Sequence, residues 1–412
     1  MTAVSDSTVF AKAEAAWRVL WQRFHHPKTH LFYDFVSSYD TERRFDHLPT
    51  TEEIKRQYPN TNGWGTGMED SMISAGVVMS MLCDRYDVTG DESLRELATD
   101  VFTGMARCAT VSHARGFLTR SISPRDGTSY YIECSRDQYT HFVHGLWRFH
   151  HSALPSEEQR NTMRGIMAAI CERMETFVVP ANDFHFCRED GTPGLVDKMW
   201  ECDPHEVARL PMIYAVGWDV TGDRRWWRNY CRHAWQAALG STRVPLGMAT
   251  VYAYLQEAIS LEPLVALEVE DPALRDAWAG AMKFVASRIE RFSWQCLKYT
   301  PLAIGDTDMN WRHWPESRRE MTPETVKLLG GHSFENHRAP DIVVRECAAV
   351  REPAEALLVQ CMAPLDVSDD QRQLLRRCVG QVDYDKSIAY GLFYCLAAYW
   401  KAVKRGILKT EE

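Results

Sequence analysis

The sequence predicts an all-α fold, a closed (α/α)6 toroid built from six helical hairpins, with residues 1–412 forming one domain. Three observations predict it. A hairpin phrase occurs twice, helix-like segments of two kinds alternate along the chain, and six segments of each kind account for its length. Repeated hairpins indicate an array of similar units, and an array that uses the whole chain leaves no room for a second domain.

The repeated phrase reads YDVTGD at 86–91 and WDVTGD at 218–223, each time between two helix-like segments. Its glycine suits the left-handed turn that ends one helix. The aspartate after it can cap the next helix by accepting hydrogen bonds from free N–H groups. Each copy therefore predicts the short connection of a helical hairpin.

The first kind of segment is amphipathic. In 91–109, Leu94, Ala98, Val101 and Met105 form one apolar stripe. Such a helix covers a core on one side and meets water on the other. Outer helices are expected at 6–25, 91–109, 156–178, 223–238, 271–291 and 369–379.

The second kind is apolar nearly all round, as in SMISAGVVMSMLC at 71–83 and SIAYGLFYCLAAYW at 387–400. Helices of this kind are buried on every side, and small residues such as Ala75 and Gly76 let a neighbouring helix come close. Inner helices are expected at 68–86, 136–151, 204–220, 246–264, 341–362 and 384–403.

The connections differ in length. Those from an inner to an outer helix are short, whereas four that lead from an outer to an inner helix are long: 26–67, 110–135, 179–203 and 292–340. In a toroid these long loops share one face, at the N-terminal ends of the inner helices. Function concentrates in long loops on a rigid scaffold, so we expect the chemistry on this face.

Composition narrows the function. A net charge of −9, without a long Lys/Arg run, argues against a nucleic-acid partner. The sequence contains no long uncharged apolar run of the kind that predicts a membrane span. The first residues, MTAVSDSTVFAKAEAAW, lack the features of a signal peptide, so we expect a cytoplasmic protein. The twelve cysteines form no CxxC pair, which favours reduced thiols over a zinc site. The oligomeric state stays open.

The strongest candidate site opens the second inner helix. Ser135 is a credible cap, Asp137 is placed to act as a general base, and Arg136 or Gln138 can orient a substrate hydroxyl. His141 lies one turn further on and shares a helix side with Asp137. The alternative is that Asp137 only complements the positive end of the helix dipole.

The first inner helix opens with GWGTGMED at 63–70. The glycines let the backbone approach a ligand, and Trp64 offers a ring for a sugar face. Glu69 or Asp70 is then a second acid opposite Asp137. The alternative is a capped helix with acidic residues in its first turn. A phosphate loop is excluded, because no GK[ST] follows.

Two further segments reach the same face. At the third inner helix Asp203 is a good cap, and His205 and Glu206 are plausible substrate ligands. In the last long loop aromatic residues alternate with polar ones, a mixture that suits carbohydrate. From that loop and the final inner helix we single out Trp311, His337, Arg338 and Tyr384, the last as an acid or hydroxyl partner.

Twelve alternating helices, acids at inner N-termini and a TGD phrase after an aromatic residue resemble the six-hairpin glycosidase superfamily. Unsaturated glucuronyl and rhamnogalacturonyl hydrolases in it use two aspartates on consecutive inner helices, and Asp70 and Asp137 match that arrangement. The stretch SRDQYTHFVHGLW is similar to one in uncharacterised bacterial six-hairpin proteins.

This resemblance implies a glycoside hydrolase that acts near the end of an oligosaccharide, including uronide-containing ones. Asp137 would be the principal acid/base, with Glu69 or Asp70 as its partner and with no metal and no cofactor.

Three alternatives stay open. N-acylglucosamine 2-epimerases and mannose isomerases share the toroid and use histidine pairs, and the segment 203–206 is similar to one of theirs. Polysaccharide lyases use Asn, His, Tyr and Arg, roles that Asn336, His337, Arg338 and Tyr384 could fill. The third alternative is a non-catalytic toroid that binds glycan or protein.

Overall fold

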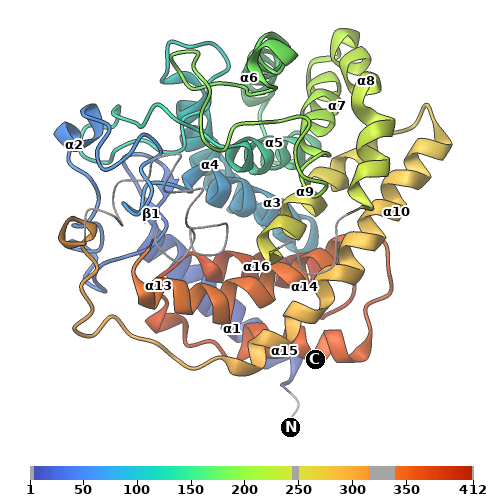
Figure 1. Cartoon of the computed structure of the whole chain (residues 1–412). Coiled ribbons are helices and arrows are strands. Elements are labelled where there is room, and N and C mark those ends of the chain that lie inside the picture. Colours follow the sequence, from blue (N-terminus) through green and yellow to red (C-terminus); the bar gives the residue numbers. More distant parts are fainter. Residues whose placement is uncertain (1–3, 244–249, 315–338, 411–412) are drawn as a thin grey trace.

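The computed structural model has the predicted all-α toroid architecture, with six inner helices surrounded by six outer ones (Figure 1). The structure describes residues 4–243, 250–314 and 339–410. None of the helices in these ranges is long and apolar enough to cross a bilayer.

The outer helices begin at polar caps and bury one side. The hydroxyl of Ser156 accepts a hydrogen bond from the main-chain N–H of Gln159 and completes a capping box, and Ser5, Asp223, Asp271 and Ser368 cap in similar ways. The outer helices are α1 (Asp6–Val19), α4 (Leu94–Thr110), α6 (Glu157–Phe177), α8 (Arg224–Ser241), α10 (Pro272–Ile289) and α15 (Asp369–Gly380).

The inner helices are buried along most of their length, as their composition predicts. They are α3 (Ser71–Thr89), α5 (Arg136–His151), α7 (Arg209–Thr221), α9 (Val251–Leu267), α14 (Glu352–Met362) and α16 (Gly391–Lys404). Before α14, α13 (Asp341–Glu346) and the π-helical turn η5 (Cys347–Arg351) continue the same rod.

Helices α7 and α16 start later than predicted, and α1 ends earlier. Helix α7 begins at Arg209 because 204–208 forms a turn, and α16 begins at Gly391 after the 3-10 turn η6 (Tyr384–Lys386). Helix α1 ends at Val19 and continues as the π-helical turn η1 (Leu20–Phe24).

The hairpin glycines adopt the predicted left-handed conformation. Gly90 has φ 62° and Gly222 has φ 74°, and their N–H groups donate to the carbonyls of Tyr86 and Trp218. These bonds satisfy carbonyls at the ends of α3 and α7. Asp223 caps α8 as predicted, with its carboxylate accepting from Arg225 N at 2.8 Å.

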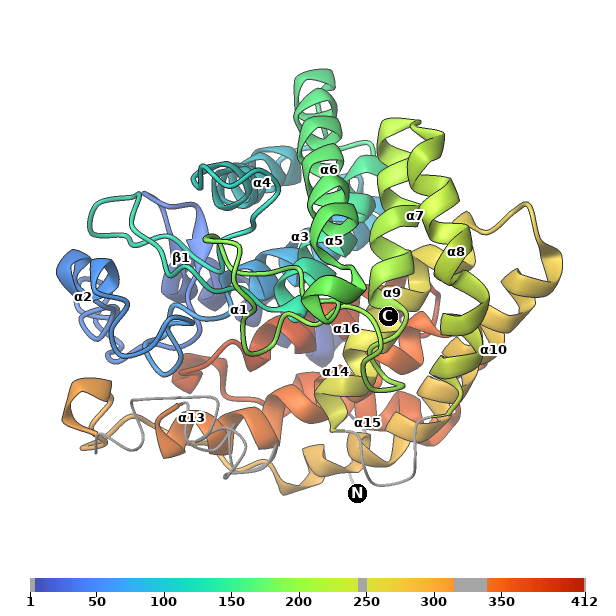
Figure 2. The same ribbon diagram turned by 45° about the horizontal axis from the view of Figure 1, so that its top comes forward.

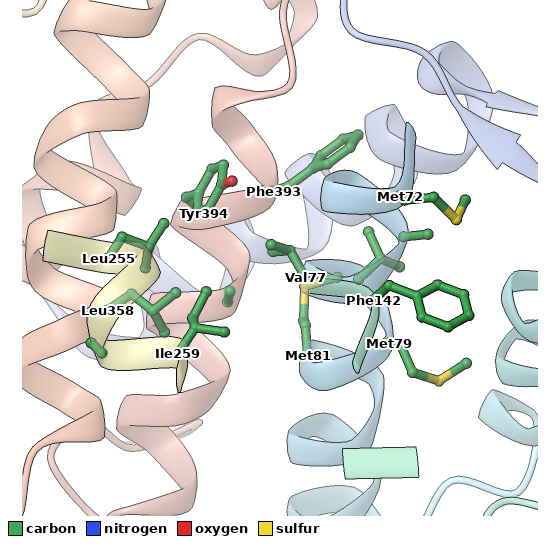
Figure 3. Close-up of a cluster of buried hydrophobic side chains, with 14 of the residues drawn as sticks. Met72, Val77, Met79, Met81, Phe142, Leu255, Ile259, Leu358, Phe393 and Tyr394 are labelled. Carbon is green, nitrogen blue, oxygen red and sulfur yellow. The ribbon is translucent and has the colours of Figure 1, made fainter. Parts of the chain in front are cut away.

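The six inner helices contact one another in chain order, and α16 closes the ring against α3 (Figure 2). Helices α3 and α5 pack closely, since a Cβ on Gly76 would lie 2.1 Å from the carbonyl oxygen of His141. Apolar side chains fill the ring interior, as Figure 3 shows for Val77, Phe142, Ile259 and Leu358. The toroid is therefore a packed core and not an open channel.

A charged network lies towards the C-terminal ends of the inner helices. Asp84 of α3 is buried and pairs with Arg148, with Lys401 at 3.1 Å and with Lys404 at 3.1 Å. Lys401 also donates to Glu262 of α9 at 3.0 Å. Four inner helices are joined there by paired charges, which leaves the opposite, N-terminal ends of the helices for a site.

The long loops carry short elements that the helical pattern does not predict. A small antiparallel hairpin pairs β1 (His25–His26) with β2 (Leu31–Phe32). The other short elements are α2 (Thr51–Lys55), η2 (Pro180–Asn182), η3 (Glu290–Lys298) and η4 (Trp311–His313).

Candidate functional site

Each inner helix places a polar or charged side chain at or next to its N-terminal end. We call this set the mouth cluster. Its members, taken in the order of the six helices, are Asp70, Asp137, Arg209, Tyr252, Arg351 and Tyr390. Hydrogen bonds, an ion pair and a cation–π contact connect neighbouring members of this cluster.

Asp70 precedes α3, but its side chain does not cap that helix. Its Oδ1 instead accepts from Gln138 Nε2 at 3.0 Å, and its Oδ2 accepts from the Tyr390 hydroxyl at 3.2 Å. A guanidinium nitrogen of Arg120 lies 3.9 Å from Oδ1. The carboxylate of Asp70 thus faces the second and sixth inner helices and not its own backbone.

Asp34 binds the backbone at Asp70. Its two carboxylate oxygens accept from the main-chain N–H groups of Glu69 at 2.9 Å and Asp70 at 3.0 Å. Burial, and then the nearby charges of Asp70 and Glu69, hold the pKa of Asp34 well above its usual value. Asp34 was not among the predicted site residues; an aspartate inside the apolar run 31–36 is the signal that could have found it.

Glu69 and Trp64 contact the glycine loop and Arg120. Glu69 Oε1 accepts from the N–H of Gly65 at 3.2 Å, within the glycine loop. Trp64 is buried, and the Arg120 guanidinium lies 5.7 Å from its ring centre. Between the two predicted acids, Asp70 is therefore the one that the fold brings to the mouth cluster.

Asp137 forms an ion pair with Arg209 of α7. Burial alone raises the pKa of Asp137, but the charges of Arg209 and Arg136 outweigh it and lower the pKa to about 2. Asp137 is therefore ionised at neutral pH. Its side chain retains 27% exposure, against 2% for Arg209, so it is accessible from the mouth.

Glu206 and His205 lie beside this ion pair. Arg136 Nη2 is 2.5 Å from Glu206 Oε1, and Arg209 Nη2 is 3.6 Å from the same oxygen. His205 Nε2 is 3.8 Å from it. Two predicted ligands thus lie in the turn before the third inner helix, where Glu206 pairs with Arg136 of the second.

His141 lies deeper in the ring. It is 1% exposed, its Nδ1 is 3.1 Å from Gln256 Nε2, and its ring stacks on Tyr252 with 6.3 Å between centroids. Burial lowers its pKa to about 3, so the imidazole is neutral. Its Nε2 has no hydrogen-bond partner among the described residues.

Arg351 completes the ring from the fifth inner rod. It donates to the Tyr390 hydroxyl and lies 4.7 Å from the ring centre of Tyr252 and 5.3 Å from that of Tyr394. Its Nε donates to Glu355 at 2.6 Å. Aromatic rings and one carboxylate therefore hold this half-buried guanidinium in place.

Tyr384 does not reach the mouth cluster. Its hydroxyl donates to the carbonyl of Val379 at 2.9 Å, and the residue is 2% exposed. The expected start of the last inner helix at 384 is too early, because α16 begins at Gly391. Tyr390 occupies the position that Tyr384 was expected to hold.

Trp311 is also placed elsewhere. It is buried, and its indole N–H donates to the carbonyl of His47 at 2.9 Å, which ties η4 to the loop before α2. His337, Arg338 and Asn336 lie outside the described residues.

The sequence missed Arg209, Tyr252, Arg351 and Tyr390 as members of the site. Arg209, Tyr252 and Tyr390 stand at the start of an inner helix or immediately before it, so the rule that selected Asp70 and Asp137 would have selected them if the helix starts had been known. Arg351 lies inside the fifth inner rod, at the end of η5, and no rule based on helix starts selects it. The arrangement offers two carboxylates in different settings, a neutral imidazole, and tyrosine hydroxyls next to guanidinium groups.

No protein-family model matches the sequence, and no curated protein matches it. Among solved structures, one described as a crystal structure of a sugar epimerase from a ruminal bacterium aligns with a TM-score of 0.47 and 9% identity, over 96% of this chain and 99% of that one. At this level of likeness no residue role passes from that protein to this chain.

Proposed function

We propose that this chain is a carbohydrate-active enzyme that hydrolyses a glycosidic bond with Asp70 and Asp137. The observation that carries the proposal is the placement of these two carboxyl groups on adjacent inner helices, one bound to Tyr390 and Gln138 and the other paired with Arg209. Hydrolysis of a glycoside requires two carboxyl groups in different protonation states, and different surroundings produce that difference.

The surroundings of the two carboxyl groups suggest which one acts as the base and which one as the acid. Asp137, with its lowered pKa, is the ionised group and suits activation of water or stabilisation of positive charge. Asp70 adjoins Asp34, and burial and the charges of Asp70 and Glu69 hold the pKa of Asp34 well above its usual value. In the proposed reaction Asp70 is the group that donates a proton to the leaving oxygen, with Tyr390 and Gln138 orienting it.

The charges at the mouth cluster favour an acidic sugar as the substrate. Arg136 is 21% exposed and Arg351 is 14% exposed, so two guanidinium groups border the mouth without being fully covered. A guanidinium binds a sugar carboxylate through paired hydrogen bonds. A uronide at the end of an oligosaccharide is the substrate class that this charge pattern favours.

The test is a panel of neutral and uronide-containing oligosaccharides, with product masses and reducing ends as the readout. We expect Asp137→Asn and Asp70→Asn each to lower turnover by about 100-fold or more on the substrate that the wild type cleaves. Asp276→Asn, which changes an exposed aspartate on α10, is the matched control and should keep full turnover. Full turnover by Asp137→Asn would remove the assignment.

His141 favours a second candidate, a sugar epimerase or isomerase. The neutral imidazole of His141, which stacks on Tyr252 of the mouth cluster and whose Nε2 has no partner among the described residues, could exchange the proton next to a sugar carbonyl. In that reaction solvent deuterium enters the sugar, and the molecular mass of the sugar changes only by the mass of the label. Deuterium incorporation without cleavage, abolished by His141→Ala, would favour this candidate over hydrolysis.

A further inference from the structure

Two histidines and an aspartate meet on the outer side of the toroid, away from the mouth cluster. His25 Nε2 lies 2.5 Å from Asp100 Oδ2, and His30 Nδ1 lies 2.5 Å from Asp100 Oδ1. One nitrogen from each imidazole and one carboxylate oxygen all lie within 4.8 Å of one another. Nothing in the mechanism proposed above uses these three residues.

The fold brings the three side chains together from two elements. His25 belongs to β1, His30 closes the turn before β2 with φ 60°, and Asp100 lies on α4. Figures 1 and 2 both show β1 beside α4. Gly104, one turn after Asp100, allows the contact, because a Cβ there would lie 2.1 Å from the carbonyl oxygen of His30.

The ring of His25 is held from both sides. Its centroid lies 5.1 Å from that of Trp21 and 5.2 Å from that of Phe32. The side chain of His25 is only 12% exposed, whereas those of His30 and Asp100 are 30% and 27% exposed. The cluster therefore has one buried, fixed member and an opening to solvent on the other side.

An ion pair does not fully account for the contacts. His25 Nε2 and Asp100 Oδ2 are buried and make no hydrogen bond among the described residues, although they are neighbours. His30 Nδ1 does share a hydrogen bond with Asp100 Oδ1 at 2.5 Å. The convergence of one nitrogen from each imidazole and one carboxylate oxygen within 4.8 Å is nevertheless the arrangement of ligands around a cation.

We propose that His25, His30 and Asp100 bind a first-row divalent cation, with Zn²⁺ as the best match. Two imidazole nitrogens and one carboxylate oxygen are a ligand set that Zn²⁺ accepts, with water in the remaining position. The cation fastens the β1–β2 hairpin to α4. The chain leaves this hairpin at Phe32 and reaches Asp34 two residues later, so the cation also steadies the residue that supports Asp70.

A second group with similar ligands shows what disfavours a cation. Asp203, His205 and Glu206 also converge, but Arg136 and Arg209 lie within 4 Å of the Glu206 carboxylate. Their positive charges oppose a bound cation.

The basic side chains that flank the β1–β2 hairpin make their hydrogen bonds to main-chain carbonyls and not to Asp100. Lys28 donates to the carbonyl of Arg125, and Arg107 donates to the carbonyls of Lys28 and Gly127. Neither occupies the carboxylate of Asp100 in the part of the chain that the structure describes. Asp100 therefore keeps its negative charge available for a cation.

The test is a titration of chelator-treated full-length protein with Co²⁺, followed by displacement with Zn²⁺. We expect one equivalent of Co²⁺ to produce the visible absorption of a four-coordinate site, Zn²⁺ to remove it, and Zn²⁺ to raise the Tm. His30→Ala should weaken Co²⁺ binding by about 100-fold or more, since it removes a direct ligand. His205→Ala is the matched control and should leave the absorption unchanged.

The readout is independent of any activity on sugars. Because His25→Ala removes a ring that packs against Trp21, Asp100→Asn serves as the second ligand variant, and its half-buried position is compatible with folding. Absence of the Co²⁺ absorption in the wild type, or unchanged binding by both His30→Ala and Asp100→Asn, would show an ion-pair cluster only. Loss of the absorption in His205→Ala would place the cation at the mouth and overturn the proposal.

Discussion

The hydroxyl of Tyr390 lies 3.2 Å from Oδ2 of Asp70 and joins the starts of the sixth and first inner helices. The two residues are separated by most of the chain, and the contact exists only because the toroid closes. The same hydroxyl accepts from Arg351, so Tyr390 links the carboxylate of Asp70 to a guanidinium.

Tyr390→Phe should impair the proton-donating role of Asp70. The ring is kept and only the hydroxyl is lost, so Asp70 loses one donor while its position is maintained. We expect kcat to fall about 10-fold, because a hydrogen bond to a charged group contributes about 1.5 kcal/mol or more. The KM should change little.

Tyr399→Phe is the control for this change, since Tyr399 is a buried tyrosine of α16 whose hydroxyl has no partner among the described residues. Equal kinetics in the two variants would mean that the Tyr390 hydroxyl has no part in the reaction.

Arg209→Met should leave the carboxylate of Asp137 without its main partner. Breaking a buried ion pair on one side costs about 3 kcal/mol, which urea denaturation at pH 7 can measure. The wild-type pair contributes stability above the unfolded pKa of about 4 and loses it as the pH falls towards the folded pKa of about 2. The variant should lack this loss between about pH 4 and pH 2.

The matched control is Arg225→Met, which breaks the more exposed pair with Glu175 on the outer surface. Exposed ion pairs contribute up to about 1 kcal/mol, so this variant should be close to the wild type. A similar loss of stability in both variants would contradict the special status of the Arg209 pair.

Glu346→Gln should flatten the dependence of stability on pH. Burial raises the pKa of Glu346 to about 8, because hydrogen bonds from the main-chain N–H groups of Ile388 and Ala389 do not offset it. The folded state therefore holds a proton that the unfolded state has released. Stability falls as the pH rises from the unfolded value of about 4.3 to about 8.

The glutamine keeps an oxygen for the N–H of Ile388, which Glu346 Oε2 binds at 2.9 Å, and cannot ionise. We expect it to gain about 2 kcal/mol relative to the wild type between pH 5 and pH 8.5, measured by urea denaturation at each pH. Glu96→Gln, an exposed change on α4, should show no such gain. Parallel pH profiles for wild type and Glu346→Gln would refute the prediction.

Gly76→Ala should separate α3 from α5. The new Cβ would meet the carbonyl of His141 at 2.1 Å, and neither backbone can move without disturbing the ring. We expect a loss of about 3 kcal/mol or failure to fold. Gly165→Ala on α6, where nothing lies within 4 Å, should instead gain about 0.5–1 kcal/mol from helix propensity. Thermal unfolding of the two variants should therefore shift the Tm in opposite directions.

Local patterns in the sequence determined the toroid. An outer helix repeats apolar residues along one stripe, whereas an inner helix is apolar all round. Each segment therefore indicates by its own residues how far it is buried. The turns at Gly90 and Gly222 are local for the same reason, since a left-handed residue is selected by its own backbone. Asp70 and Asp137 could also be proposed from sequence, because each stands near a recognisable helix start.

Only the tertiary structure decided which side chains meet. Tyr390 replaced Tyr384 because the start of α16 depends on the turn before it, and Asp34 gained its position from main-chain N–H groups far along the chain. The partners Arg209 and Arg351, and the hairpin that sets His25 and His30 against Asp100, arise from contacts between elements. Such contacts depend on how the ring closes, which no single segment of sequence specifies.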